Sequence, residues 1–95
     1  MNRNGSSRIL ILEDTSADAE LAQREIRKSL GECEFQVVHT RENFLRALQA
    51  FQPDVILSDY ILPQFDGLTA VKLALQYAPL TPIIIWTSSV SEDIV

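Results

Sequence analysis

Cysteine, basic residues and long apolar runs are all scarce in this sequence, and each shortage excludes a class of protein. The single cysteine, Cys33, cannot form an intrachain disulfide or supply a set of zinc ligands. Eight basic residues against 13 acidic ones give a net charge of −5, which argues against a general nucleic-acid-binding protein because such a protein needs a basic surface. No apolar run approaches the roughly 18–20 residues of a membrane span. We therefore expect a soluble, cytoplasmic domain.

Length and composition indicate one folded domain. A chain of 95 residues, 46% of them hydrophobic and 22% charged, is large enough for one small core but not for two. Residues 1–7 contain no apolar core of the kind that a secretory signal has. The sequence predicts a short disordered leader at residues 1–7 and a single domain over residues 8–95.

Short apolar segments alternate with amphipathic ones along the chain. The apolar segments predict strands buried on both faces, at residues 8–12, 35–39, 54–58 and 83–86. Predicted helices run from Thr15 or Ser16 to Gly31, from Thr40 to just before Pro53, and from Asp66 or Gly67 to about Ala78, and Ser91 is expected to begin another. This alternation predicts an α/β fold, a doubly wound, mostly parallel sheet with helices on both faces.

The third predicted helix has an apolar stripe at helical spacing. The stripe consists of Leu68, Val71, Leu75 and Ala78. Because residues three and four apart lie on one face of a helix, we expect this stripe to face the sheet.

Polar residues follow three of the predicted strands. Glu13 and Asp14 follow the first, Asp59 follows the third, and Thr87 follows the fourth. The carboxyl ends of parallel strands share one edge of a sheet, where open α/β folds bind ligands. Grouped carboxylates repel unless a cation joins them, and hard oxygen ligands favour Mg²⁺. The set suggests phosphoryl chemistry, although Asp59 taken alone has an equal interpretation as an acid that caps the following turn.

Two other features argue against nucleotide hydrolysis and against a catalytic histidine. The chain has no glycine-rich Walker loop, so nucleotide hydrolysis is not expected. His39 is the single histidine, and at the end of a strand it is more typical of a solvated residue than of a catalytic one.

The ordered motifs resemble those of the receiver domain of two-component response regulators. The resemblance rests on Ile9–Leu12 leading into Glu13-Asp14, on Asp54-Val-Ile-Leu-Ser-Asp59, on Leu62-Pro63 and Asp66-Gly67, and on Pro82-Ile-Ile-Ile-Trp-Thr87-Ser88. It extends from about Arg8 to the last residue. It implies a flavodoxin-like receiver fold with strand order 2-1-3-4.

The resemblance also implies roles for individual residues. Asp59 would take a phosphoryl group from the phosphohistidine of a histidine kinase or phosphotransfer protein. Glu13, Asp14 and Asp59 would hold Mg²⁺ together with the main-chain carbonyl of Ile61, and Thr87 would hydrogen-bond the acyl phosphate. The phosphorylated domain would switch an output domain or target protein. Such a domain is a signalling module, with at most slow self-catalysed phosphotransfer and autodephosphorylation.

The sequence departs from the family pattern at its carboxyl end. The family fold closes with a fifth strand and a fifth helix, and a lysine after that strand contacts the phosphoryl group. Lys28 and Lys72 fall on predicted helices, so we expect a chain truncated before the fifth strand that accepts phosphate poorly. The strand at residues 83–86 would then be an unpaired apolar edge, through which the chain would dimerise or aggregate.

Two alternatives stay open on the sequence alone. One is a degenerate receiver that only binds partners, which the missing lysine favours and the intact acids oppose. The other is a phosphohydrolase of the haloacid dehalogenase type, which also uses an aspartate nucleophile at a strand end. That class has a second acid two residues beyond the nucleophile, where this chain has Ile61.

Overall fold

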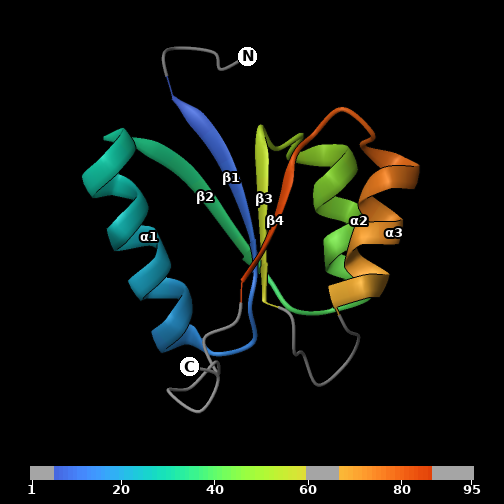
Figure 1. The fold of residues 1–95 in the computed structure, drawn as a ribbon, viewed down its shortest axis with the longest axis horizontal. Helices are drawn as coiled ribbons and strands as arrows, with labels where there is room; N and C mark the ends of the chain where they lie inside the picture. Colours follow the sequence, from blue (N-terminus) through green and yellow to red (C-terminus); the bar gives the residue numbers. More distant parts are fainter. Residues whose placement is uncertain (1–5, 60–66, 87–95) are drawn as a thin grey trace, which may run out of the picture.

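The described part of the chain forms a four-stranded parallel sheet between two layers of helix. The structure, a computed structural model, describes residues 6–59 and 67–86. Its elements are β1 (Ser7–Leu12), α1 (Ser16–Leu30), β2 (Cys33–Val38), α2 (Arg41–Ala50), β3 (Val55–Asp59), α3 (Gly67–Tyr77) and β4 (Ile83–Trp86). The strand order is β2-β1-β3-β4, as predicted. Figure 1 shows α1 on one face of the sheet and α2 with α3 on the other.

The interior strand β1 contains an uninterrupted apolar run, Ile9–Leu12. It lies between β2 and β3, with helices covering both of its faces, so Ile9, Leu10, Ile11 and Leu12 are all buried. Ile9 and Ile11 belong to the hydrophobic cluster beneath α1, whereas Leu10 and Leu12 belong to the larger cluster beneath α2 and α3. A strand buried on both sides needs apolar residues at every position, not at alternate ones.

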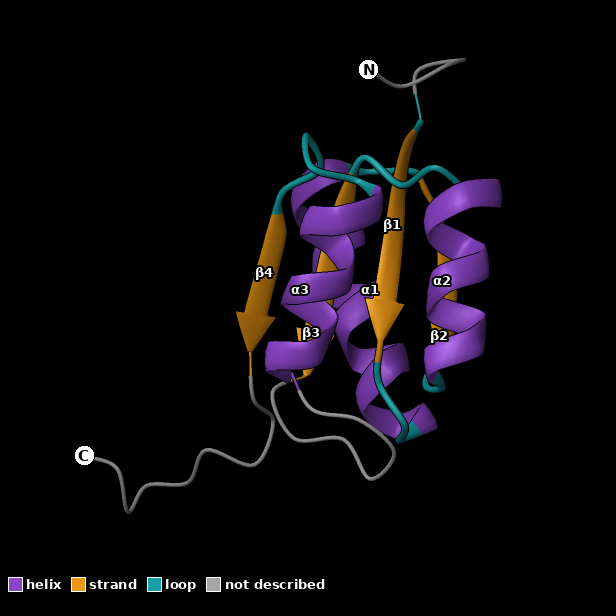
Figure 2. Ribbon diagram, turned by 90° about the vertical axis from the view of Figure 1, so that its right-hand side faces the viewer, coloured by secondary structure: helices purple, strands orange, loops and turns teal. Residues whose placement is uncertain are grey.

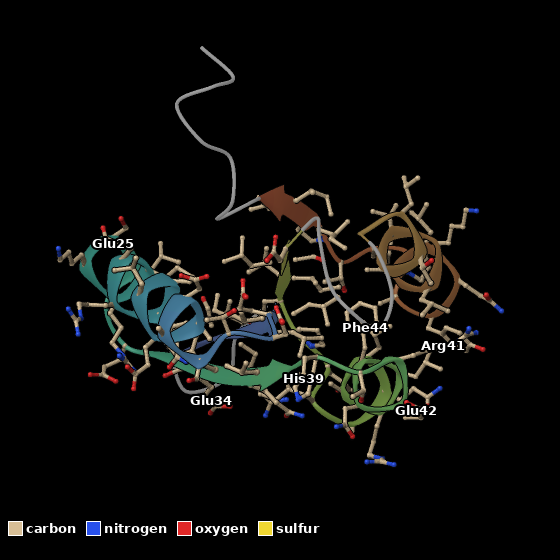
Figure 3. All side chains as sticks on the ribbon, turned by 90° about the horizontal axis from the view of Figure 1, so that it is seen from below. Glu25, Glu34, His39, Arg41, Glu42 and Phe44 are labelled. Atoms are coloured by element: carbon tan, nitrogen blue, oxygen red, sulfur yellow. The ribbon has the colours of Figure 1, made fainter. Side chains whose placement is uncertain are left out.

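Helix α2 is capped at its first turn and buries one apolar face. The Thr40 side chain accepts a hydrogen bond of 3.1 Å from the backbone N–H of Asn43, which satisfies one free donor of the first turn. Phe44 is fully buried and lies between α2 and α3 in the view of Figure 3. The helix ends at Ala50, with Phe51 as its C-cap, and the next residue, Gln52, has a left-handed backbone with φ of 54°.

The predicted stripe on α3 is wrong in part. Leu68 and Leu75 are 59% and 61% exposed, and the residues of α3 that are buried are Gly67, Ala70, Leu73 and Ala74. Three of these four buried residues are small, so this face can pack closely against its neighbours, and Leu68 and Leu75 lie outside it. Volume, and not only spacing, decides which side of this helix is buried.

Some element boundaries differ from the predicted ones. β1 begins at Ser7, inside the predicted leader, because Ser7 pairs with Cys33 in β2. For the same reason β2 starts two residues earlier than expected, and His39 is an exposed residue just beyond its end (Figure 3). Residues 1–5 and the predicted helix start at Ser91 lie outside the described residues.

Candidate functional site

The parallel register brings the first and third strand ends together. Leu12 of β1 is the Cα partner of Ser58 of β3, and one residue further along each strand come Glu13 and Asp59. Glu13 is 2% exposed and Asp59 is 4% exposed, while Asp14 is exposed to solvent. Carboxylate oxygens from these three residues all lie within 4.8 Å of one another. The predicted acidic cluster is therefore present.

The backbone around Glu13 holds its side chain in place. Its N–H donates to the Val38 carbonyl at 2.9 Å, which extends the β1–β2 ladder by one residue. The backbone N–H of Thr15, the residue that precedes α1, donates to Glu13 Oε2 at 3.0 Å. The other carboxylate oxygen, Oε1, is the one buried side-chain polar atom without a hydrogen-bond partner in the described part of the chain. An orphaned buried oxygen is costly, and a bound cation would satisfy it.

The electrostatics of the cluster resist full ionisation. Burial raises the pKa of Glu13 from 4.5 to about 7, although the Thr15 N–H opposes the rise. The neighbouring Asp59 carboxylate and, to a smaller extent, the charge of Asp18 raise the pKa further. A protonated Glu13 can donate a hydrogen bond to the Asp59 carboxylate. In the absence of a cation, this proton lowers the negative charge of the cluster by one.

Asp59 is held by the last position of β3. Its Cα partner on β4 is Trp86, so the residue is part of the sheet and does not lie on a free loop. The buried hydroxyl of Ser58 donates to the Asp59 carbonyl at 3.0 Å. A carboxylate attached to a rigid strand end has a defined position, which favours a ligand or nucleophile over the turn-capping role.

The donor set of the cluster fits a magnesium ion. Three carboxylates supply hard oxygen ligands, and an exposed member, Asp14, leaves one side of the cluster open to water. Mg²⁺ typically keeps several waters and binds one or two carboxylates. Neither cysteine nor histidine belongs to this group of described residues, so softer transition metals have no preferred ligand here.

Two predicted site residues cannot be placed. Thr87 and the carbonyl of Ile61 lie outside the described residues. The two candidate lysines lie on helices, as predicted, where Lys28 pairs with Glu25 at 3.3 Å and Lys72 is exposed on α3.

Three supporting residues were not singled out by sequence reasoning. They are the Thr15 amide, the Ser58 hydroxyl and the Asp18 charge. The sequence indicates Thr15 only as a possible start of the first helix, and the Thr15 side chain makes no capping hydrogen bond. Because Thr15 lies two residues after Glu13, its backbone N–H is within reach of the Glu13 carboxylate, and the sequence could have indicated this contact. Nothing in the sequence indicates the hydrogen bond from Ser58 to the Asp59 carbonyl.

Comparison with known proteins identifies the family. The response regulator receiver domain family matches the sequence over residues 9–95. The chain belongs to this family. Receiver domains are the phosphoacceptor modules of two-component signalling, and the match leaves no place for the haloacid dehalogenase alternative.

Individual relatives agree with this assignment. The chain is 31% identical over 85 residues to the DNA-binding transcriptional regulator NtrC of Proteus hauseri, which covers 90% of this chain and 18% of that protein. The phosphorylated cyanobacterial phytochrome response regulator RcpA is 28% identical, with a TM-score of 0.72, over 93% of this chain and 69% of the other. The receiver domain of sensor histidine kinase PA1611 from Pseudomonas aeruginosa, solved with a magnesium ion coordinated in its active-site cleft, is 25% identical, with a TM-score of 0.73, over 94% and 74%.

The match covers a small part of the curated relatives. The chain spans 14% of the length of the first of them and 24% of the third. In the described residues, no helix is both long enough and apolar enough to cross a membrane.

Proposed function

We propose that this receiver domain accepts a phosphoryl group on Asp59 from the phosphohistidine of a histidine kinase or phosphotransfer protein in the cytoplasm. The observation that carries the proposal is the carboxylate cluster at the ends of β1 and β3, with its orphaned Glu13 oxygen. The phosphorylated form then acts on an output domain or a target protein. In this role the domain is a signalling module, with at most slow self-catalysed phosphotransfer and autodephosphorylation.

The residues that would hold Mg²⁺ are Glu13, Asp14 and Asp59, with the Ile61 carbonyl as a further ligand. When bound, the ion offsets the repulsion between an anionic nucleophile and an anionic phosphoryl donor. The support for this assignment is the chemistry of the donor set, its compactness and the buried oxygen without a partner.

In the proposed reaction Asp59 is the nucleophile. One of its carboxylate oxygens forms a bond to phosphorus, while the bond from phosphorus to the imidazole nitrogen breaks and its electron pair stays on the histidine. Asp59 has to be ionised for this step. Burial raises the pKa of Glu13, so Glu13 is the group that carries the proton of the metal-free cluster, and it would release this proton when it ligates the cation. Thr87 donates a hydrogen bond to the phosphoryl oxygens in this scheme.

A pair of acids at opposite ends of one strand supplies the test. The chain is incubated with Mg²⁺ and phosphoramidate, a small donor with the same phosphorus–nitrogen bond, and its intact mass is measured. We expect the unchanged chain and Asp54→Asn to gain one phosphoryl group that hydroxylamine removes, and Asp59→Asn to gain none. Asp54 is the matched control because it immediately precedes β3 at the far end, and asparagine keeps a side-chain oxygen to accept from Arg8.

Two results would contradict the proposal. Labelling of Asp59→Asn would show that another group is the acceptor. A folded, Mg²⁺-binding chain that is never labelled would instead support the second candidate, a receiver that binds partners without phosphorylation.

A further inference from the structure

A buried hydroxyl interrupts the apolar side of β3 that faces α2 and α3. Ile56 and Ser58 lie on this side because side chains alternate along a strand, and Ile56 belongs to the core cluster beneath those helices. The Cα partners of Ser58 are Leu12 on β1 and Ile85 on β4. Ser58 is 0% exposed, so its hydroxyl is shielded from water beside apolar neighbours. A hydroxyl in such a place is costly unless it makes a hydrogen bond.

The Ser58 hydroxyl makes that hydrogen bond with the backbone of the nucleophile. It donates to the Asp59 carbonyl at 3.0 Å. The Ile56 N–H donates to Pro82 on the β4 side, and backbone groups alternate in direction, so those of Asp59 point toward β1. The β1–β3 ladder has its last pair at Leu12 and Ser58, one residue earlier. The hydroxyl therefore supplies a donor to a carbonyl at the end of the ladder.

The sheet holds the other side of the Asp59 backbone. Figure 2 shows β1 and β4 running in the same direction with β3 between them, and Asp59 is the last residue of β3, with Trp86 of β4 as its Cα partner. The ladder fixes the peptide group before Asp59, and the Ser58 hydroxyl fixes the peptide group after it. Together they set the direction of the Cα–Cβ bond. That direction decides whether the carboxylate lies within 4.8 Å of those of Glu13 and Asp14.

We propose that Ser58 is a positioning residue for the Asp59 carboxylate, because its hydroxyl fixes the peptide group that follows the nucleophile. The inference rests on the proposed function, in which Asp59 ligates Mg²⁺ and accepts the phosphoryl group. The Ser58 side chain lies on the opposite face of the sheet from that of Asp59, so it acts through the backbone and touches neither the cation nor the donor.

A purely structural role for the hydroxyl predicts a different result. Without the hydroxyl the free energy of unfolding would then change, but every folded chain would bind Mg²⁺ and take up phosphate as before. A positioning role instead predicts a folded chain that binds Mg²⁺ more weakly and reacts more slowly. A misplacement of about 1 Å can lower a rate about 100-fold, so the loss of one of two constraints is expected to cost about tenfold.

Three substitutions of Ser58 separate the two roles. Ser58→Thr and Ser58→Val are a matched pair, since threonine and valine have the same branched shape and differ in the hydroxyl. Ser58→Ala removes the hydroxyl without adding volume. For each chain with an unchanged circular dichroism spectrum, two quantities are measured. They are the rate of phosphoramidate labelling against donor concentration at saturating Mg²⁺, and the Mg²⁺ dissociation constant from backbone amide shifts.

The expected results follow from the lost hydrogen bond. Ser58→Ala and Ser58→Val should lower the maximal labelling rate about tenfold, with the KM for phosphoramidate unchanged. They should also weaken Mg²⁺ binding about threefold. Ser58→Thr should stay within about twofold of the unchanged chain in both measurements, because its hydroxyl can make the same contact.

Other results would overturn the proposal. They are a Ser58→Ala chain that matches the unchanged chain in both measurements or does not fold, or equal values for Ser58→Thr and Ser58→Val. If the two larger residues prevent folding, Ser58→Ala decides. An unchanged chain that binds Mg²⁺ but is never labelled would reject the proposed function alone. The Mg²⁺ affinities of the four proteins would then still test the positioning role, with weakening in Ser58→Ala and Ser58→Val but not in Ser58→Thr as the supporting result.

Discussion

The amino and carboxyl ends of β1 and β3 differ in how their charged side chains are arranged. At the amino end, the Arg8 backbone N–H donates to Asp54 at 2.8 Å, and its guanidinium donates to the Phe51 carbonyl at 2.9 Å and pairs with Glu34. Opposite charges are joined there. At the carboxyl end, Glu13 and its acidic neighbours bring like charges within 4.8 Å, and one buried oxygen has no partner.

This contrast separates structural charge from functional charge. The amino-end network fastens β1 to β2 and to the segment between α2 and β3, and its members satisfy one another. The carboxyl-end cluster contributes repulsion and an unfilled hydrogen bond, which lower stability unless something binds. Groups that are costly in the free protein and become favourable with a ligand are typical of binding sites.

The pH dependence of stability gives the largest expected difference between the two ends. The pKa of Glu13 rises from 4.5 to about 7 on folding, so between these values the folded protein holds a proton that the unfolded chain releases. This contribution to the free energy of unfolding is present below pH 4.5, falls as pH rises, and is lost above pH 7. It amounts to roughly 3 kcal/mol at most.

Urea unfolding of the metal-free chain at pH 5 and pH 8 measures this effect, with Glu13→Gln as the reference. Groups away from the cluster titrate equally in both proteins, so the difference between their pH dependences isolates the contribution of Glu13 and the Asp59 carboxylate beside it. The unchanged chain should lose more stability than the variant on going to pH 8. An identical loss in both would show that the carboxyl end does not hold the extra proton.

Removing the amino-end network should cost stability without affecting the site. Arg8→Met keeps the apolar stem but loses the hydrogen bond to Phe51 and the ion pair with Glu34, for about 1–3 kcal/mol in urea unfolding. The exposed Arg24 on α1 is the control, since Arg24→Met should change stability by less than about 0.5 kcal/mol. The Mg²⁺ affinity should be the same in all three proteins, and a weakened affinity in Arg8→Met would show that the ends are coupled.

A smaller effect on the free energy of unfolding is expected at Gln52, which lies between Phe51 and Asp54 of the amino-end network. Gln52 has φ of 54°, a left-handed conformation that suits glycine, so Gln52→Gly should be neutral or gain up to about 1 kcal/mol. Gln49, exposed within α2, is the matched position, where glycine should lose about 0.5–1 kcal/mol. A comparable loss at both positions in thermal or urea unfolding would show that the turn is not strained.

The sequence was sufficient for the fold and the acidic cluster but not for their fine structure. Buried strands such as Ile9–Leu12 are evident as continuous apolar runs, and right-handed crossovers then put Glu13 and Asp59 at one edge. Periodicity failed on α3 because it cannot distinguish a face of small residues that packs closely from a flank of leucines. The contact of Ser58 with the Asp59 carbonyl depends on tertiary burial, which no local pattern encodes.

The most direct test of the account is a titration of Mg²⁺ into the ¹⁵N-labelled chain, followed by the backbone amide resonances at both ends of β1 and β3. The account predicts saturable shifts at Glu13, Asp14 and Asp59, with no change at Arg8 or Val55 at the far ends of the same strands. Glu20→Gln, which changes an exposed acid of α1, should leave those shifts intact, and Glu13→Gln should weaken them. Equal shifts at both ends, or none at millimolar Mg²⁺, would contradict the claim that the carboxyl-end acids form a cation site.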